Sequence, residues 1–117
     1  MEHIITKENV DEAVAFIRKR VDVADGALGI VLGSGLGGLV DAIDGATCID
    51  YAEVPHMVPS TAPLHAGRFV IGTLGKRPVI CMQGRLHAYE GNTPQQVAFP
   101  IVLMHALGAN ELVVTNA

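Results

Sequence analysis

The sequence has little aromatic content, little charge and no internal repetition. Its 117 residues include no tryptophan, 4% aromatic and 17% charged residues, against 50% hydrophobic residues. A chain of this length and apolar content can bury one core, and no repeat, linker or low-complexity tract divides it. We therefore expect a single compact domain over residues 1–117.

A basic run is also missing. The net charge is −4 and the isoelectric point is near 5.6. A nucleic-acid surface needs clustered lysine and arginine side chains to neutralise phosphodiesters, so nucleic acid is excluded as the main partner. A small anion needs only a local cluster of donors.

No hydrophobic run is long enough to cross a membrane. The longest stretch, residues 97–109, contains Pro100 and His105 and falls short of the ~20 residues that a spanning helix requires. The first residues, Met1-Glu2-His3, do not form a secretory signal, because they lack a basic region followed by an apolar one. We expect a cytoplasmic protein with no membrane partner.

Cysteine is scarce as well. With only Cys48 and Cys81, and a cytoplasmic setting, we expect two small buried apolar groups rather than a disulfide. Neither cysteine has the spacing of a metal ligand, so no metal site is expected.

Hydrophobic periodicity and turn residues predict an α/β order of elements. Asn9 and Glu12 are expected to cap the first helix, Gly45 to separate the second helix from the next strand, and prolines to make residues 54–64 a loop. Thr93 and Pro94 begin a nearly all-apolar helix that stops at Gly108. The predicted helices are 10–21, 36–43 and 94–107, and the predicted strands are 27–32, 46–51, 68–74, 76–82 and 111–115.

The glycine-rich turn at residues 33–38 is the most informative segment. It reads Gly-Ser-Gly-Leu-Gly-Gly and directly follows an apolar strand. Glycines let backbone N–H groups converge on an anion, and Ser34 adds a hydroxyl donor, so phosphate is the natural ligand. A tight turn with a surface serine is the alternative.

A second polar cluster, residues 83–91, follows the end of another predicted strand. Arg85 and His87 alternate there, so both side chains could point to the same side. Arginine can hold two phosphate oxygens with its planar fork, and histidine adds a donor near neutral pH. The alternative is a strand exit whose charged residues are solvated.

The predicted strand at residues 111–115 comes last, after an apolar helix. In open α/β sheets, ligands collect beyond the carboxyl ends of strands. We interpret this order as a fold cut short, with apolar surface that more chain or a partner would cover.

Taken together, these motifs resemble the N-terminal portion of the trimeric purine nucleoside phosphorylase family. The resemblance covers essentially all of this chain but about two fifths of a family member, and each motif is modest while their combination is specific. The matching segments are Leu32–Gly37, Ser60–Gly67, Gln83–Gly91 and Val113–Ala117.

The resemblance implies a mixed central β-sheet flanked by helices, here incomplete, and it implies phosphorolysis. Inorganic phosphate attacks the anomeric carbon of a purine ribonucleoside, releasing the base and ribose 1-phosphate without a cofactor. An oxocarbenium-like state is both stabilised and captured by the bound anion. The resemblance also implies a homotrimer.

The resemblance further implies site residues. The expected phosphate contacts are Ser34, His65, Arg85, His87 and the backbone of Ala117, with Tyr89 on the ribose. Beyond phosphate positioning, no catalytic residue is expected in these 117 residues. His65 could instead cap the following strand, and Tyr89 could be an ordinary packed aromatic side chain.

Two other functions fit parts of the sequence. Gly33, Gly35 and Gly38 satisfy a dinucleotide-binding fingerprint, with Glu53 twenty residues after the first glycine. Against this, Glu53 lies in a proline-bounded loop and the reading gives no role to Arg85 and His87. A non-catalytic assembly or regulatory piece is the second alternative.

Overall fold

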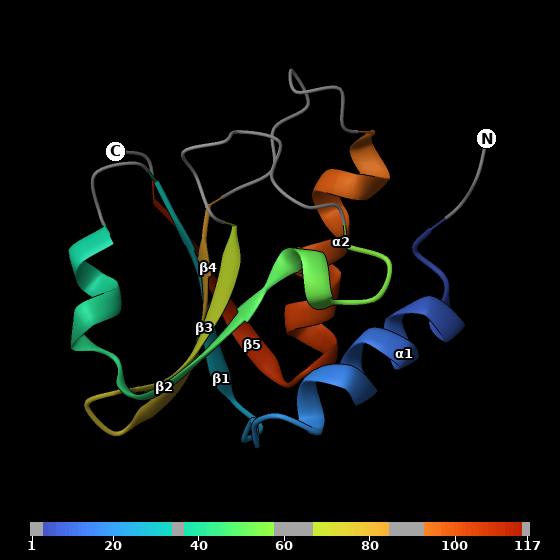
Figure 1. Ribbon diagram of the computed structural model, residues 1–117. Helices are drawn as coiled ribbons and strands as arrows, with labels where there is room; N and C mark the ends of the chain where they lie inside the picture. Colours follow the sequence, from blue (N-terminus) through green and yellow to red (C-terminus); the bar gives the residue numbers. More distant parts are fainter. Residues whose placement is uncertain (1–3, 34–36, 58–66, 85–92, 116–117) are drawn as a thin grey trace.

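The computed structural model describes residues 4–33, 37–57, 67–84 and 93–115. They form one five-stranded sheet with the strand order β2-β3-β4-β1-β5 (Figure 1). The helices are α1 (Lys7–Arg18) and α2 (Pro94–Ala106), with 3-10 helices η1 (Gly37–Ala42) and η2 (Tyr51–Glu53). The strands are β1 (Ala27–Leu32), β2 (Asp44–Asp50), β3 (Arg68–Leu74), β4 (Arg77–Gln83) and β5 (Ala109–Val114).

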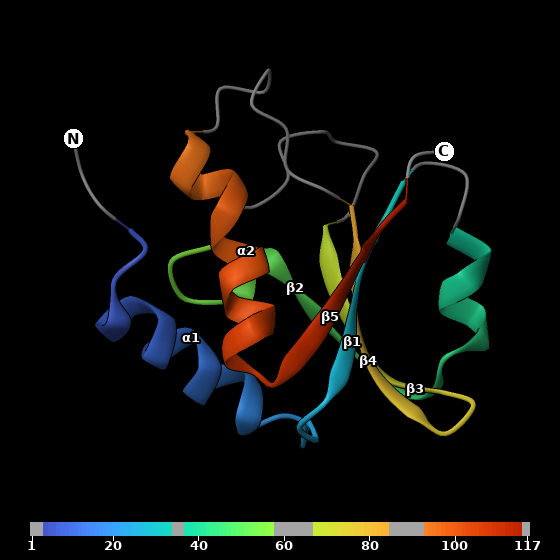
Figure 2. The ribbon, with the colours of Figure 1, turned by 180° about the vertical axis from the view of Figure 1, so that it is seen from behind.

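The sheet is mixed, which confirms the predicted fold class. β1 lies between β4 and β5 and runs parallel to both, whereas β2, β3 and β4 pair antiparallel. α1 and α2 cover one face, and η1 lies against the other (Figures 1 and 2). The carboxyl ends of the three parallel strands therefore meet at one end of the sheet.

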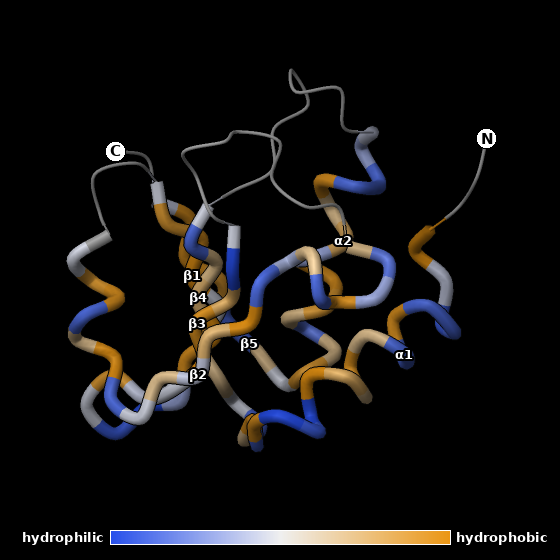
Figure 3. Tube along the Cα trace, viewed as in Figure 1, coloured by the Kyte–Doolittle hydropathy of each residue, from blue (hydrophilic) through white to orange (hydrophobic). Residues whose placement is uncertain are grey.

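Strand alternation divides the core into two layers. Phe69, Ile80 and Met82 face α1 and α2, while Val70 and Cys81 belong to a smaller cluster with Ile43 and the half-buried Val40 near η1. Hydrophobic residues follow the central strands, and α1 alternates between hydrophobic and hydrophilic residues (Figure 3). Strands whose side chains are apolar on both faces of the sheet are buried on both faces, as in parallel sheets that helices cover.

The first helix begins earlier than predicted. Thr6 is its N-cap, and its hydroxyl accepts the backbone N–H of Asn9 at 3.1 Å. The predicted cap by Asn9 and Glu12 is therefore wrong, because Asn9 already lies inside the first turn. Val10, Ala13 and Ile17 supply the buried face, as the periodicity indicated.

The second half of the chain follows its turn signals closely. β3 and β4 form the predicted hairpin, and Gly75 begins its two-residue turn at φ 63°. Thr93 caps α2 through the backbone N–H of Gln96, whose side chain in turn accepts the N–H of Thr93. The predicted start of this helix is confirmed, and its end differs by one residue.

Gly45 lies inside β2 instead of separating two elements. The register between β2 and β3 shifts between Asp44 and Thr47, and Gly45 takes φ 61° at this bulge. The bulge absorbs one extra residue, so pairing continues past Gly45 to Asp44. The sequence prediction was wrong here because a glycine at a bulge resembles a glycine at a strand start.

The two cysteines differ in environment. Cys81 is fully buried in β4, as predicted, and burial raises the pKa of its thiol to about 11. Cys48 is exposed in β2, so the expectation of a buried thiol is wrong at that position. β2 is an edge strand, and only one of its residues, Ile49, is buried in the core. Both thiols are free.

Replacing Gly72 with alanine should destabilise the sheet. A Cβ at Gly72 would lie 2.5 Å from the backbone oxygen of Asp44 and 2.6 Å from Cγ2 of Ile43. Relieving that overlap means displacing the bulged strand, and we expect a loss of about 1–3 kcal/mol in the free energy of unfolding, measured by urea titration.

Gly38→Ala is the matched control for this substitution. Nothing lies within 4 Å of a Cβ at Gly38, so its effect should stay within about 0.5 kcal/mol. Equal free energies of unfolding for the two variants would contradict the close approach at Gly72.

Candidate functional site

Every residue that the motifs assigned to phosphate or ribose lies outside the described residues. The residues that flank these segments are described, and they show where each segment joins the sheet. The predicted site residues concerned are Ser34, His65, Arg85, His87, Tyr89 and Ala117.

The flanking residues gather at one end of the sheet. Gly33 follows β1, Gly84 follows β4, Thr115 follows β5 and Gly67 precedes the antiparallel β3. The register places Leu32 beside Gln83 and Gln83 beside Arg68, while Val31 pairs with Val114. We call this region the carboxyl end; it lies at the top of the sheet in Figure 1.

Thr115 joins the ends of β1 and β5. Its backbone N–H and its hydroxyl both donate to the carbonyl of Val31, each at 3.0 Å. The same hydroxyl accepts the N–H of Gly33 at 2.8 Å. One side chain therefore fixes the residue before Ser34 and the strand exit before Ala117.

Tyr51 connects the other two flanking residues, Gly67 and Gly84. Its backbone N–H donates to the carbonyl of Gly67 at 3.1 Å, and its hydroxyl donates to the carbonyl of Gly84 at 2.6 Å. The ring is fully buried and makes an edge contact with Phe69 at 5.0 Å between centroids. Burial, with a smaller contribution from Cys81, raises the pKa of Tyr51, so the hydroxyl stays a donor.

The β4 exit turns sharply where the predicted cluster begins. Gly84 takes φ 93°, a conformation that favours glycine, directly before Arg85. Next to it, the Nε of Arg68 donates to the side-chain oxygen of Gln83 at 2.6 Å. Arg68 thus brings a permanent positive charge to the carboxyl end, which favours an anion there.

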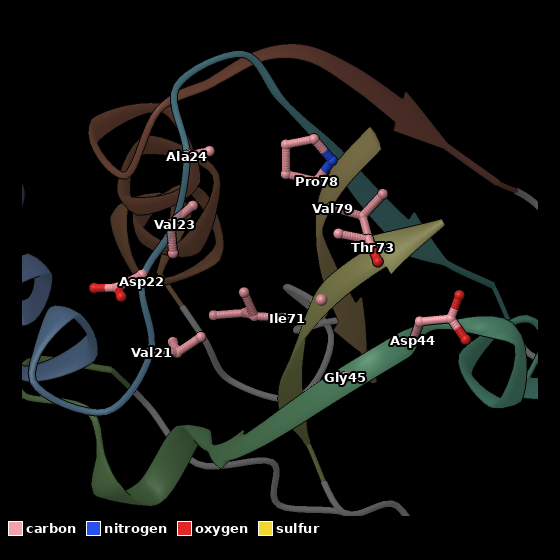
Figure 4. Close-up of a pocket in the computed structure, with 11 residues that line it drawn as sticks. Val21, Asp22, Val23, Ala24, Asp44, Gly45, Ile71, Thr73, Pro78 and Val79 are labelled. Carbon is pink, nitrogen blue, oxygen red and sulfur yellow. The ribbon is translucent and has the colours of Figure 1, made fainter. Parts of the chain in front are cut away.

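A hollow of about 470 Å³ lies at the opposite end of the sheet (Figure 4). Its lining comes from the segment before β1, the start of β2 and the β3–β4 hairpin, and includes Asp22, Asp44 and Thr73. The described residues that line it include no lysine, arginine or histidine. Two carboxylates without a basic partner disfavour phosphate, so this hollow is not the predicted site.

Glu53 is engaged in the fold. One carboxylate oxygen accepts from Arg20 at 3.1 Å, and the other accepts the N–H of Asp50 at 3.3 Å. A dinucleotide-binding acid must instead reach a ribose hydroxyl at the end of a strand. Glu53 lies on η2, which disfavours the dinucleotide alternative.

The histidines of the described segments have structural neighbours. Nε2 of His56 lies 3.0 Å from Glu12 on α1, and His56 takes φ 68°. His105 lies near the end of α2, where its Nδ1 is 3.2 Å from the carbonyl of Ala109. Within the described ranges, no three His, Cys, Asp or Glu side chains come together as a metal site.

Sequence reasoning missed the contributions of Tyr51 and Thr115. From the sequence, Thr115 is only part of a matching segment, and Tyr51 is only the last residue of a predicted strand. A hydroxyl at a strand terminus beside a glycine turn is a usable signal for Thr115. No sequence signal pairs Tyr51 with Gly84, because that bond depends on the register of three strands.

The comparisons with known proteins agree with this geometry. The family model described as the phosphorylase superfamily matches residues 27–117, which include all five strands. The chain therefore belongs to the phosphorylase superfamily.

Its relatives within the superfamily are purine nucleoside phosphorylases. Purine nucleoside phosphorylase 1 of Bacillus subtilis is 43% identical over 111 residues, covering 95% of this chain and 41% of that protein. The Bos taurus enzyme is 49% identical over 88 residues, or 75% of this chain and 30% of that protein.

Solved structures give the same result. Isoform 2 of the Schistosoma mansoni purine nucleoside phosphorylase, in complex with cytosine and ribose-1-phosphate, superposes with a TM-score of 0.88 at 39% identity. The match covers 95% of this chain and 39% of that one. The matches therefore cover between 30% and 41% of the length of these relatives.

Replacing Tyr51 with phenylalanine should weaken the carboxyl end. The variant keeps the ring and its contact with Phe69 but leaves the Gly84 carbonyl without its donor. We expect a loss of about 1–2 kcal/mol in the free energy of unfolding, with faster amide exchange near Gly84. Denaturant titration and hydrogen exchange measure the two effects.

Tyr51→Ala provides the comparison for this prediction. It removes the ring as well as the hydroxyl and should cost about 3–5 kcal/mol, as expected for the loss of a large buried aromatic. A Tyr51→Phe variant as stable as the parent would show that the hydroxyl contributes nothing at the β4 exit.

Proposed function

We propose that this chain forms the phosphate-binding half of a purine nucleoside phosphorylase. The reaction is the phosphorolytic cleavage of purine ribonucleosides of the inosine and guanosine type to the free base and ribose 1-phosphate. One observation carries the proposal: the segments holding Ser34, His65, Arg85, His87 and Ala117 all join the sheet at its carboxyl end.

The chemistry suits that arrangement. Phosphate must be held against the anomeric carbon while positive charge develops on the sugar, and donors fixed in advance stabilise that state without reorganisation. Backbone N–H groups after β1 and β5 would bind the anion's oxygens. Arg85 would add a bidentate charge-assisted contact, and Tyr89 would contact the ribose.

The proposed partners are inorganic phosphate and a purine nucleoside, with two further copies of the chain completing a trimer. The reaction uses no cofactor, since phosphate is itself a substrate. A role in purine salvage in the cytoplasm fits this reaction. No helix of the described segments is both long and apolar enough to cross a membrane.

A non-catalytic assembly role is the second candidate, and the outer side of β5 favours it. β5 is an edge strand, and its residues Leu112, Val113 and Val114 are 46%, 44% and 50% exposed. An edge strand with exposed apolar side chains is suited to pairing with another strand. A chain with this role would self-associate without binding phosphate.

Phosphate titration by calorimetry distinguishes the two functions. We expect the 117-residue chain to bind phosphate and Arg85→Ala to bind it about ten- to a hundredfold more weakly, because one charge-assisted contact is lost. Arg18→Ala is the matched control. It removes the same charge from the exposed end of α1 and should leave the affinity unchanged.

Release of hypoxanthine from inosine should be measured in parallel. We expect turnover to be slow, because half a site lacks most of the fixed geometry that gives the rate. Any turnover should depend on phosphate and vanish in Arg85→Ala. If the parent chain binds phosphate no better than Arg85→Ala does, the proposal is wrong.

A further inference from the structure

The side chain of Thr115 takes a position that the sheet's own pattern would give to a backbone group. In a parallel ladder, a residue that donates its N–H to one partner residue accepts, through its carbonyl, the N–H two positions later. The N–H of Thr115 donates to the carbonyl of Val31 in this way. A regular ladder would then direct the N–H of Gly33 to the carbonyl of Thr115.

The N–H of Gly33 is instead bound by the Thr115 hydroxyl, at 2.8 Å. The hydroxyl hydrogen is directed to the Val31 carbonyl at 3.0 Å, so the oxygen both donates and accepts. The side chain thus holds the end of β1 in register with β5 at the point where the regular ladder stops.

This exchange has a consequence for the two strand exits. The end of β1 stays tied to β5, while the N–H of Gly33 binds the hydroxyl of Thr115 in place of its carbonyl. Gly33 lies one residue before Ser34, and Thr115 lies two residues before Ala117. The hydroxyl therefore holds Gly33 and Thr115 together, and these residues lie next to two segments proposed to bind the same anion.

We propose that Thr115 is a positioning residue for phosphate, acting through the N–H of Gly33 and the end of β5. This inference rests on the proposed function, because the phosphate site concerned is the one proposed above. It assigns no contact between Thr115 and the phosphate. A hydroxyl at position 115 is the required feature, and the methyl group is not.

Three variants test it. Thr115→Val keeps the shape and removes the hydroxyl, whereas Thr115→Ser keeps the hydroxyl and removes the methyl group. Thr73→Val makes the same hydroxyl-to-methyl change in β3, at the opposite end of the sheet. Each variant of the 117-residue chain is titrated with inorganic phosphate, and the amide exchange rate of Gly33 is measured by NMR.

We expect Thr115→Val to weaken phosphate binding about tenfold, the fold-change that corresponds to one hydrogen bond. Gly33 exchange should accelerate about tenfold in the same variant. Thr115→Ser should retain most of the affinity and the slow exchange, and Thr73→Val should match the parent in both.

The outcomes separate this inference from the proposed function. If the parent chain does not bind phosphate, both the proposed function and the positioning role fail. If the parent binds and Thr115→Val binds equally well, only the positioning role is overturned. A loss of affinity in Thr115→Val with unchanged Gly33 exchange also overturns it, because the N–H of Gly33 is the proposed route.

Discussion

The parallel pairing of β1 with both β4 and β5 is the constraint on which the rest depends. Parallel strands end on the same side, so this pairing brings three strand exits together, and β3 enters at the same place. In a sheet built only from hairpins, successive strands would end at opposite ends of the sheet. Both faces of β1 are covered, since Val31 packs in one core cluster and Ile30 in the other, and this explains its nearly unbroken apolar sequence.

Two residues with hydroxyl groups, Tyr51 and Thr115, add hydrogen bonds at the strand ends, where the β-ladder stops. The Tyr51 hydroxyl binds the carbonyl of Gly84 after β4, and its backbone N–H binds the carbonyl of Gly67 before β3. Thr115 ties the end of β1 to β5, so two residues hold three strand exits and one strand entry. Both groups are better placed to determine geometry than to contact a ligand: Tyr51 is fully buried, and both bonds of the Thr115 hydroxyl are to backbone. Both residues hold backbone groups directly beside the segments that carry the predicted site residues.

Much of this fold is predictable from the sequence, and the failures have physical causes. The bounds of β1, the β3–β4 hairpin and the cap of α2 follow from local signals, namely an apolar run, a glycine turn and a Thr-Pro pair. The error at Asn9 arises because Thr6 is better placed to cap the helix, and the error at Gly45 because the glycine lies at a bulge. Cys48 is exposed because it lies on an edge strand. The site motifs are local in sequence, so the sequence alone yields a prediction of the site, and its residues lie outside the described ones. The bonds of Tyr51 and Thr115 depend on strand register, so no local signal predicts them.

The bond between Gly33 and Thr115 joins residues 82 positions apart, whereas the β3–β4 hairpin closes over two residues. Contacts distant in sequence carry a larger loop-closure cost and tend to form late. During folding, the hairpin can therefore form before β5 pairs with β1, and the two exits tied by Thr115 come together only when that pairing forms. An anion bound between these exits would stabilise the pairing of β5 with β1 and slow the departure of β5 from the sheet.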